Sequence, residues 1–336
     1  MGSVWLPRIE LITSASEIVG YKAGLCLNQS EMAKFIPESC LSYWDGPSEA
    51  TLRIRSEEFE DLVQSILYGV GYISDPHPDP LGISLIHKYK NDEDKFRILE
   101  DVMRLRNEWM KKVLMTTKSK SIDPTPFILE AIKKHGSIGG RIATEIINGI
   151  VEYQHGNPWS TFRRVEWVDV AELKDLFISE SLNTFYGSFI DQRYIDYLER
   201  NFDDIDSLNW RKFEALTCEF FKREGYYVEI GKGRDDDGID ARVWPSKESV
   251  FQPPVILVQC KRSKKKVSKT VVKALWADVE YEKAGSGLVV TTSSISPGAK
   301  KSCKARGYKI DEADRDTLRA WVQKMRTPFT GVFLGE

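Results

Sequence analysis

Two short stretches in the C-terminal third decide the fold of this chain: Gly238-Ile239-Asp240 and Val255-Ile256-Leu257-Val258-Gln259-Cys260-Lys261. The second is a run of apolar β-formers that ends in polar residues, which predicts a buried strand. Because side chains alternate between the two faces of a strand, Gln259 and Lys261 share one face. If the two stretches are neighbouring strands, Asp240 joins them on that face. A carboxylate, an amide oxygen and an ammonium group would then form one polar patch.

This combination of groups predicts metal-assisted chemistry. A carboxylate with neighbouring oxygens suits a hard divalent cation such as Mg²⁺. A lysine beside the metal can position or deprotonate the attacking water. The position of Asp240 within a predicted strand favours a functional role, because a carboxylate there is costly unless it is paired or bound to metal. These are the groups that hydrolysis of a phosphodiester requires.

The composition predicts an ordinary globular chain without a membrane segment. Its 336 residues are 41% apolar and carry a net charge of −2, and the length is enough for about two or three domains. No apolar run approaches the roughly 20 residues of a membrane helix, and we identify no signal peptide at the N-terminus. The five cysteines are scattered without a close pair, which argues against a zinc site and against disulfides. We therefore expect the protein in the reducing cytoplasm, away from membranes.

From about residue 205 the pattern alternates between helices and strands. We expect a first helix over 208–224, with Ser207 as its N-cap and Gly225 at its end. Further helices are expected before Gly285, over 296–306 and over 314–325, and strands over 227–230, 239–244, 255–262, 288–292 and 308–310. Strand, helix, strand is a crossover unit, which implies a parallel pair. The prediction is a small α/β domain, with a mixed sheet flanked by helices.

The N-terminal part is harder to interpret and is expected to be mostly α or α+β. Helices are predicted over 56–69 and 92–115, and alternating prolines predict a loop over 75–80. Residues 124–168 follow the order helix, turn at 137–140, helix and extended arm, which is typical of a winged-helix unit for recognition or regulation. Two packed helices and a hairpin also occur in many other folds.

The domain organisation follows from a change in composition. A predicted helix over 191–201 leads into Asp203-Asp204-Ile205-Asp206, an acidic and polar stretch that we interpret as a domain boundary. We therefore predict an N-terminal region of unknown fold at 1–120, a winged-helix-like unit at 121–204 and an α/β domain at 205–336.

Four motifs in the last 130 or so residues carry a family resemblance. They are Phe213-Glu214-Ala215-Leu216, Asp237-Gly238-Ile239-Asp240, Val258-Gln259-Cys260-Lys261-Arg262 and Leu288-Val289-Val290-Thr291-Thr292-Ser293. In this order and spacing, residues 208–326 resemble the catalytic domain of Mrr-type restriction endonucleases, which belong to the PD-(D/E)xK nuclease superfamily. The resemblance implies a restriction-endonuclease-like fold for the C-terminal domain.

The resemblance also implies a role for each site residue. Asp240 would be the metal-binding acid, and Gln259 would stand in place of the superfamily's second acid, as is usual in Mrr-type domains. The backbone carbonyl of Cys260 would be a further metal ligand. Glu214 would supply the missing negative charge, although it could instead form a surface pair with nearby lysines and arginines. Lys261 would orient or activate water, although a lysine at a strand end can also simply extend to solvent.

A basic run directly follows the predicted site strand. The run from Lys261 to Lys273 contains no acidic residue. Five of its basic residues are the candidates for nucleic-acid contact: Arg262, Lys264, Lys265, Lys266 and Lys269. Charge runs are usually solvated surface, but one beside a nuclease site favours contact with the phosphate backbone. Asp235 and Asp236 are better explained as a solvated turn. None of the four histidines lies in the C-terminal domain, so a histidine mechanism has no support.

The predicted function is a Mg²⁺-dependent DNA endonuclease in restriction or phage defence, with Mn²⁺ as a substitute metal. The N-terminal region would recognise the target or gate activity. Cutting both strands needs two active sites, so we expect a homodimer or larger assembly. Two alternatives remain open: an effector nuclease on DNA or RNA that a signal molecule or partner protein activates, and a non-catalytic nucleic-acid-binding protein on a nuclease fold.

Overall fold

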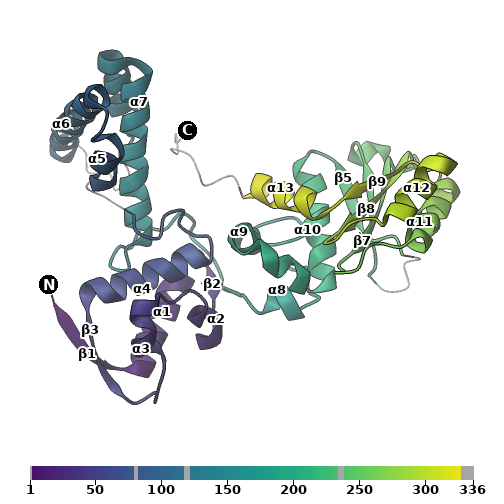
Figure 1. Ribbon diagram of the computed structural model, residues 1–336, viewed down its shortest axis with the longest axis horizontal. Helices are drawn as coiled ribbons and strands as arrows, with labels where there is room; N and C mark the ends of the chain where they lie inside the picture. The colour runs from purple at the N-terminus through teal and green to yellow at the C-terminus, as the bar shows by residue number, and fades with distance from the viewer. Residues whose placement is uncertain (1, 79–81, 117–121, 234–237, 327–336) are drawn as a thin grey trace.

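The computed structural model describes residues 2–78, 82–116, 122–233 and 238–326. Figure 1 shows three regions: an N-terminal lobe, a helical arm that projects from it, and a C-terminal domain built on a sheet. A connecting segment, residues 157–201, joins the arm to the C-terminal domain. Within the described ranges, no helix is both long and apolar enough to cross a bilayer.

The C-terminal domain is organised around a five-stranded mixed sheet in the order β5-β6-β7-β8-β9. β6 pairs antiparallel with both β5 and β7, whereas β7, β8 and β9 run parallel to one another. The strands are β5 (Tyr227–Ile230), β6 (Ala241–Trp244), β7 (Ile256–Lys261), β8 (Ser286–Thr291) and β9 (Ile310–Ala313). The predicted mixed sheet and its parallel crossover are confirmed.

Helices cover both faces of this sheet, which explains why its central strands are apolar on both sides. One face buries Ala241, Val258 and Val290 in the main core of the molecule, and the other buries Leu257 and Val289 in a separate core. The helices are α10 (Trp210–Arg223), α11 (Lys269–Glu282), α12 (Pro297–Arg306) and α13 (Arg315–Met325), with a short 3-10 helix, η3 (Lys247–Ser249).

The start of α10 differs from the prediction. Ser207 does not cap it, because Ser207 ends the 3-10 helix η2 (Phe202–Ser207). The N-cap is Asn209, whose side-chain oxygen accepts a hydrogen bond from the backbone N–H of Arg211 at 2.8 Å. Either residue type satisfies a free N–H at a helix start, so propensity alone does not choose between them.

The N-terminal lobe packs short strands against four α-helices and one short 3-10 helix. β1 (Ser3–Pro7) pairs antiparallel with β3 (Thr51–Arg55), and β2 (Leu25–Cys26) pairs parallel with β4 (Ala171–Glu172) of the connecting segment. The predicted helix at 56–69 is confirmed. The helices are α1 (Arg8–Ala23), α2 (Gln29–Ala33), η1 (Glu38–Cys40), α3 (Leu41–Trp44) and α4 (Ser56–Gly69).

The helical arm has its own small core, formed by α5 (Ile83–Tyr89), α6 (Glu93–Thr116) and α7 (Thr125–Gly156). Leu99 and Val102 of α6 pack with Phe127 and Ile142 of α7 in that core. The boundary predicted at residue 120 therefore falls inside a packed unit, because helices from both sides of it share one core.

The helix, turn, helix and strand order predicted for residues 124–168 is wrong in two elements. The helix is interrupted by a kink at Gly136 (φ 64°, ψ −153°). The predicted turn at 137–140 already belongs to the helical segment that follows the kink. A Cβ on Gly139 would lie 2.4 Å from the carbonyl oxygen of Ala131, so this glycine allows close packing and does not form a turn. No strand forms over 164–168, so the predicted wing is not found.

The connecting segment ties the N-terminal lobe to the C-terminal domain through α8 (Asp175–Ile178) and α9 (Gln192–Arg200). The acidic stretch that we interpreted as a boundary is not a loose linker. It lies in η2, where Phe202 and Ile205 are buried in the main core and Asp206 pairs with Arg315 of α13 at 2.9 Å. One continuous core therefore runs from the N-terminal lobe to the sheet.

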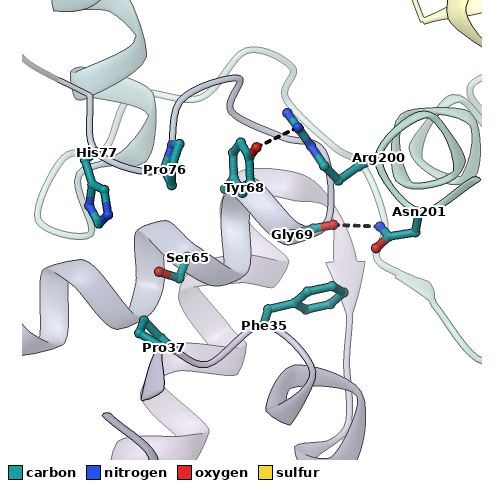
Figure 2. Close-up of a pocket in the computed structure, with 9 residues that line it drawn as sticks. All are labelled: Phe35, Pro37, Ser65, Tyr68, Gly69, Pro76, His77, Arg200 and Asn201. Carbon is teal, nitrogen blue, oxygen red and sulfur yellow. Dashed lines mark hydrogen bonds between the residues drawn. The ribbon is translucent and has the colours of Figure 1, made fainter. Parts of the chain in front are cut away.

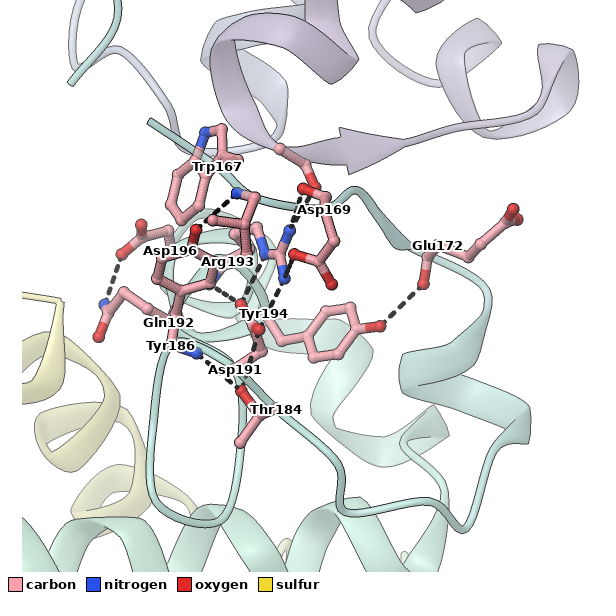
Figure 3. A network of polar contacts seen from close by, with 12 residues as sticks. Trp167, Asp169, Glu172, Thr184, Tyr186, Asp191, Gln192, Arg193, Tyr194 and Asp196 are labelled. Atoms are coloured by element: carbon pink, nitrogen blue, oxygen red, sulfur yellow. Dashed lines mark hydrogen bonds and ion pairs between the residues drawn. The ribbon is translucent and has the colours of Figure 1, made fainter. Parts of the chain in front are cut away.

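A polar cluster around Arg193 fixes this junction (Figure 3). Its guanidinium group donates to both carboxylate oxygens of Asp191 at 2.7 and 2.8 Å, and to the carbonyl oxygen of Gly24 in the N-terminal lobe at 3.0 Å. The two remaining N–H groups bond to the carbonyl and carboxylate oxygens of Asp169, both at 3.1 Å. The rings of Trp167 and Tyr186 lie at 5.1 and 5.0 Å from it. All five N–H groups of this buried guanidinium group therefore have acceptors.

Candidate active site

Asp240 lies just before β6, where the chain enters the sheet. Its backbone N–H donates to the carbonyl oxygen of Val258 at 2.9 Å, and its carboxylate accepts from the backbone N–H of Cys260 at 2.6 Å. The side chain is 8% exposed. The predicted neighbourhood of Asp240 and the end of β7 is confirmed, and the carboxylate is held by the strand that carries the other candidates.

Glu214 reaches the same place from α10. It is buried, accepts a hydrogen bond from Arg211 at 2.8 Å and contacts the carboxyl group of Asp240. Burial, followed by the negative charge of Asp240, raises the pKa of Glu214 well above its usual range. The alternative of a surface pair is therefore wrong, since the carboxyl group faces inward and pairs with Arg211.

Gln259 contributes an unpaired oxygen to the site. Its Nε2 donates to the carbonyl oxygen of Gly238 at 2.9 Å, whereas its Oε1 is buried and has no hydrogen-bond partner among the residues that the structure describes. Gly238 adopts φ +82°, and a Cβ there would lie 3.0 Å from Nε2. A buried acceptor without a donor is costly, so it is typical of a place where a ligand binds.

Lys261 follows Gln259 by two positions on β7, so its side chain shares the same face of the strand. Threonines at the end of β8 fix the chain around it. The hydroxyl of Thr291 donates to the carbonyl oxygen of Lys261 at 2.8 Å, and Thr292 Oγ1 accepts from the backbone N–H of Ser263 at 3.2 Å. These bonds hold the start of the basic loop.

The basic loop connects β7 to α11 and lies beside the site. Its five candidate side chains, Arg262, Lys264, Lys265, Lys266 and Lys269, are all exposed. Arg262 also donates to the carbonyl oxygen of Asp206 at 3.3 Å. Exposure is what contact with a nucleic-acid backbone would require, and the same exposure also fits a merely solvated surface.

The oxygen donors at the end of β7 fit a hard divalent cation. They comprise the carboxylate of Asp240, the unpartnered Oε1 of Gln259 and the nearby carboxyl group of Glu214. No group of three or more His, Cys, Asp or Glu residues suited to a metal occurs within the described ranges. Asp235, Asp236 and Asp237 lie outside the described residues.

Comparison with known proteins agrees with this geometry. Residues 205–322 match the Mrr catalytic family, described as restriction endonuclease. The C-terminal domain is a Mrr-type restriction endonuclease domain. A solved structure, the MspJI restriction endonuclease in complex with a 27-mer oligonucleotide, aligns with 54% of this chain and 40% of its own, at 18% identity and a TM-score of 0.28. No match was found among curated proteins.

The match supports a nuclease, and restriction endonucleases typically use a divalent metal. The structure brings the carboxyl groups of Asp240 and Glu214 together, and Gln259 and Lys261 share one face of the adjacent strand β7. Cys260 has a different environment, because its thiol lies 3.7 Å from the hydroxyl of Thr217 on α10. Burial, and then the charge of Asp240, raises the pKa of Cys260 well above its ordinary value, so it is not a thiolate nucleophile.

Arg211 is the site residue that sequence reasoning missed. Besides its bond to Glu214, it donates to the carbonyl oxygen of Gly231 at 2.7 Å, and so links α10 to the loop that follows β5. The available signal was the spacing of three residues between an arginine and a glutamate on one helix, which places them side by side. That spacing is common on helix surfaces, so it did not single out a buried pair.

Proposed function

We propose that this protein is a Mg²⁺-dependent endonuclease that hydrolyses DNA phosphodiester bonds, and that Mn²⁺ can substitute for Mg²⁺. One observation carries the proposal: within the nuclease domain, two buried carboxyl groups face each other beside β7, and the buried Oε1 of Gln259 on that strand has no hydrogen-bond partner among the described residues. A purely structural cluster would satisfy that oxygen from the protein. A cation would satisfy it and would also relieve the repulsion between the two carboxyl groups.

The residues would divide the work as follows. Asp240, Gln259 Oε1 and the backbone carbonyl of Cys260 would hold the cation, with Glu214 as a second negative charge beside it. The bound metal would neutralise phosphate charge and lower the pKa of a coordinated water. Lys261 would donate hydrogen bonds to the attacking water or to a phosphate oxygen, and so stabilise the charge that develops there. Arg211 would keep Glu214 in place.

The basic loop is proposed to hold the DNA backbone. Its cations are exposed and stand next to the site, which favours phosphate contacts that carry no sequence information. Target recognition or gating would then belong to the N-terminal lobe and the arm. We propose restriction or phage defence as the setting, a homodimer or larger assembly as the cutting form, and the cytoplasm as its location.

Cleavage of plasmid DNA tests the site directly. Asp240→Asn keeps an oxygen for the Cys260 N–H but removes the charge, so we expect Mg²⁺-dependent cleavage to fall about 10³-fold, since a metal supplies several kcal/mol of charge stabilisation. Lys261→Met should cause a loss of about 10²-fold. The measurement compares linearisation and nicking of methylated and unmethylated plasmid with Mg²⁺ or with EDTA.

Two exposed residues of the same domain serve as matched controls. Asp311→Asn on β9 and Lys301→Met on α12 remove the same charges away from the site and should retain full activity. Cleavage that persists in EDTA, or that Asp240→Asn leaves intact, would contradict the proposal. Any dependence on methylation would show what the N-terminal part recognises.

A further inference from the structure

Two adjoining hollows lie where the N-terminal lobe meets the nuclease domain. Their volumes are about 350 and 460 Å³, and they share Phe35, Arg200 and Asn201 as lining residues. The first is lined mainly by the lobe, and Figure 2 shows it between α4 and the end of α9. The second extends to η2 and to Arg319 of α13. Their combined size is in the range of sites that bind small organic ligands.

The first hollow has flat, apolar walls. Phe35, Pro37 and Pro76 line it together with the ring of Tyr68. Phe35 is held in place by close packing, because a Cβ on Gly69 would lie 2.3 Å from its ring. Aromatic rings and prolines arranged in this way suit a planar ring that can stack or slide between them.

The guanidinium group of Arg200 lines both hollows, and most of its N–H groups have no acceptor among the described residues. Its guanidinium group lies 3.8 Å from the centre of the Tyr68 ring and donates one hydrogen bond, to the Tyr68 hydroxyl at 2.8 Å. Its Nε is buried and has no partner in the part of the chain that the structure describes. Arg193, in contrast, uses all five of its N–H groups. Unused donors on a partly buried cation indicate an anionic partner.

The second hollow adds two more cations. Lys34 is exposed, and Arg319 lies over the ring of Phe202 at 4.3 Å. The carboxylates nearby are already engaged: Asp203 pairs with Arg315 at 2.8 Å, and Asp204 accepts a hydrogen bond from Tyr197. Arg319 also lies 4.0 Å from the Asp203 carboxylate, and the lining carries three cations (Lys34, Arg200 and Arg319) against two carboxylates.

From this juxtaposition we infer that the two hollows form one binding site for a nucleotide. The base would lie in the apolar part against Phe35 and Tyr68, and the phosphate would bind Lys34, Arg200 and Arg319. A free nucleotide and a nucleotide extruded from DNA present the same chemistry, a flat heteroaromatic ring joined to a phosphate. Because both the lobe and the nuclease domain line the site, the ligand favours their docked arrangement.

Binding is measured on the full chain in EDTA, so the result does not depend on nuclease activity. We expect saturable binding of the fluorescent nucleotide mant-ATP and its displacement by AMP or dAMP. Phe35→Leu, Lys34→Gln and Arg319→Gln should each weaken it about 10-fold, the loss typical of one stacked ring or one charged hydrogen bond. Arg97→Gln, on the exposed surface of α6, is the matched control and should leave binding unchanged. Thermal unfolding checks that each variant is folded.

A second arm distinguishes the source of the nucleotide. A DNA duplex containing 2-aminopurine becomes brighter when that base leaves the stack. Brightening that is lost in Phe35→Leu, without mant-ATP binding, would support an extruded nucleotide, whereas mant-ATP binding alone would support a free one. The absence of both signals would overturn the inference. It would also be overturned if inorganic phosphate displaced mant-ATP as well as AMP does, because the site would then bind an anion and no base.

Discussion

The Arg193 cluster and the candidate active site are both buried and polar, yet they differ in one respect. Around Arg193, every guanidinium N–H has an acceptor and the charge is balanced by Asp191 and Asp169 (Figure 3). At the end of β7, Gln259 Oε1 has no partner within the described residues, and two carboxyl groups face each other. The first cluster is complete in the protein alone, whereas the second leaves an acceptor without a donor among the described residues.

This difference separates a structural role from a functional one. A satisfied buried network fixes one arrangement of the chain, because breaking any bond leaves an unpaired group. An unsatisfied network costs stability, and proteins retain such costs where a ligand or a reaction compensates for them. If the comparison holds, Mg²⁺ should restore the stability lost by a substitution at the candidate active site but not the stability lost at Arg193.

The largest effect on stability is expected at Arg193. Arg193→Met would leave the Asp191 carboxylate buried without its counter-charge, which costs about 3–5 kcal/mol of unfolding free energy. Urea unfolding measures this loss, and Mg²⁺ should not restore it. Arg97→Met removes an exposed pair on α6 and should cost under about 1 kcal/mol. Equal losses of unfolding free energy in Arg193→Met and Arg97→Met would contradict the structural role of the Arg193 cluster.

Gln259→Glu tests the second cluster of the comparison, the candidate active site. The substitution adds a third carboxyl group beside Asp240 and Glu214 and removes the donor to Gly238, so in EDTA we expect a loss of about 1–3 kcal/mol. Mg²⁺ should recover most of this loss, because a carboxylate binds the cation more tightly than an amide does. Urea unfolding with Mg²⁺ and with EDTA provides the measurement. A loss that Mg²⁺ leaves unchanged would mean that the oxygen does not face a metal.

Asp196, near the Arg193 cluster, provides a smaller and pH-dependent test. Burial raises the pKa of Asp196 to about 7, above its value of about 3.9 in an unfolded chain. Its contribution to stability is therefore full below about pH 4 and is lost as the pH rises through 7. Asp196→Asn should match the wild type at low pH and be the more stable of the two at pH 8. Unfolding curves across this range that stay parallel would contradict the assignment.

The sequence was sufficient to predict the nuclease domain because its signals are local. The apolar run before Gln259, the cap at Ser296 and the left-handed glycine at Gly307 each define an element without reference to distant residues. The candidate site was proposed from alternation along β7, which places Gln259 and Lys261 on one face. Asp240 could be added because its partner strand was also recognisable.

What could not be predicted depends on contacts between distant segments. Even at Gly139, where the contact is with nearby Ala131, sequence does not distinguish a glycine that forms a turn from one that lets the two halves of α7 pack closely across the kink at Gly136. Nothing local shows that Phe202 and Ile205 anchor an otherwise acidic stretch in the core. Arg200, which lines the proposed nucleotide site, gains its role only when α9 meets Tyr68 of the N-terminal lobe.

The continuous core limits where the nuclease domain can be cut out and fused to another protein. Gln192 and Arg223 both donate to the carbonyl oxygen of Met325, at 3.3 and 2.8 Å, so α9 is bound to the last helix although it precedes the family match. A fragment cut at residue 205 would expose apolar surface that natural modules keep covered. A fusion of this nuclease domain to another DNA-binding protein should therefore include α9, because the contacts between α9 and the last helix belong to the folded unit.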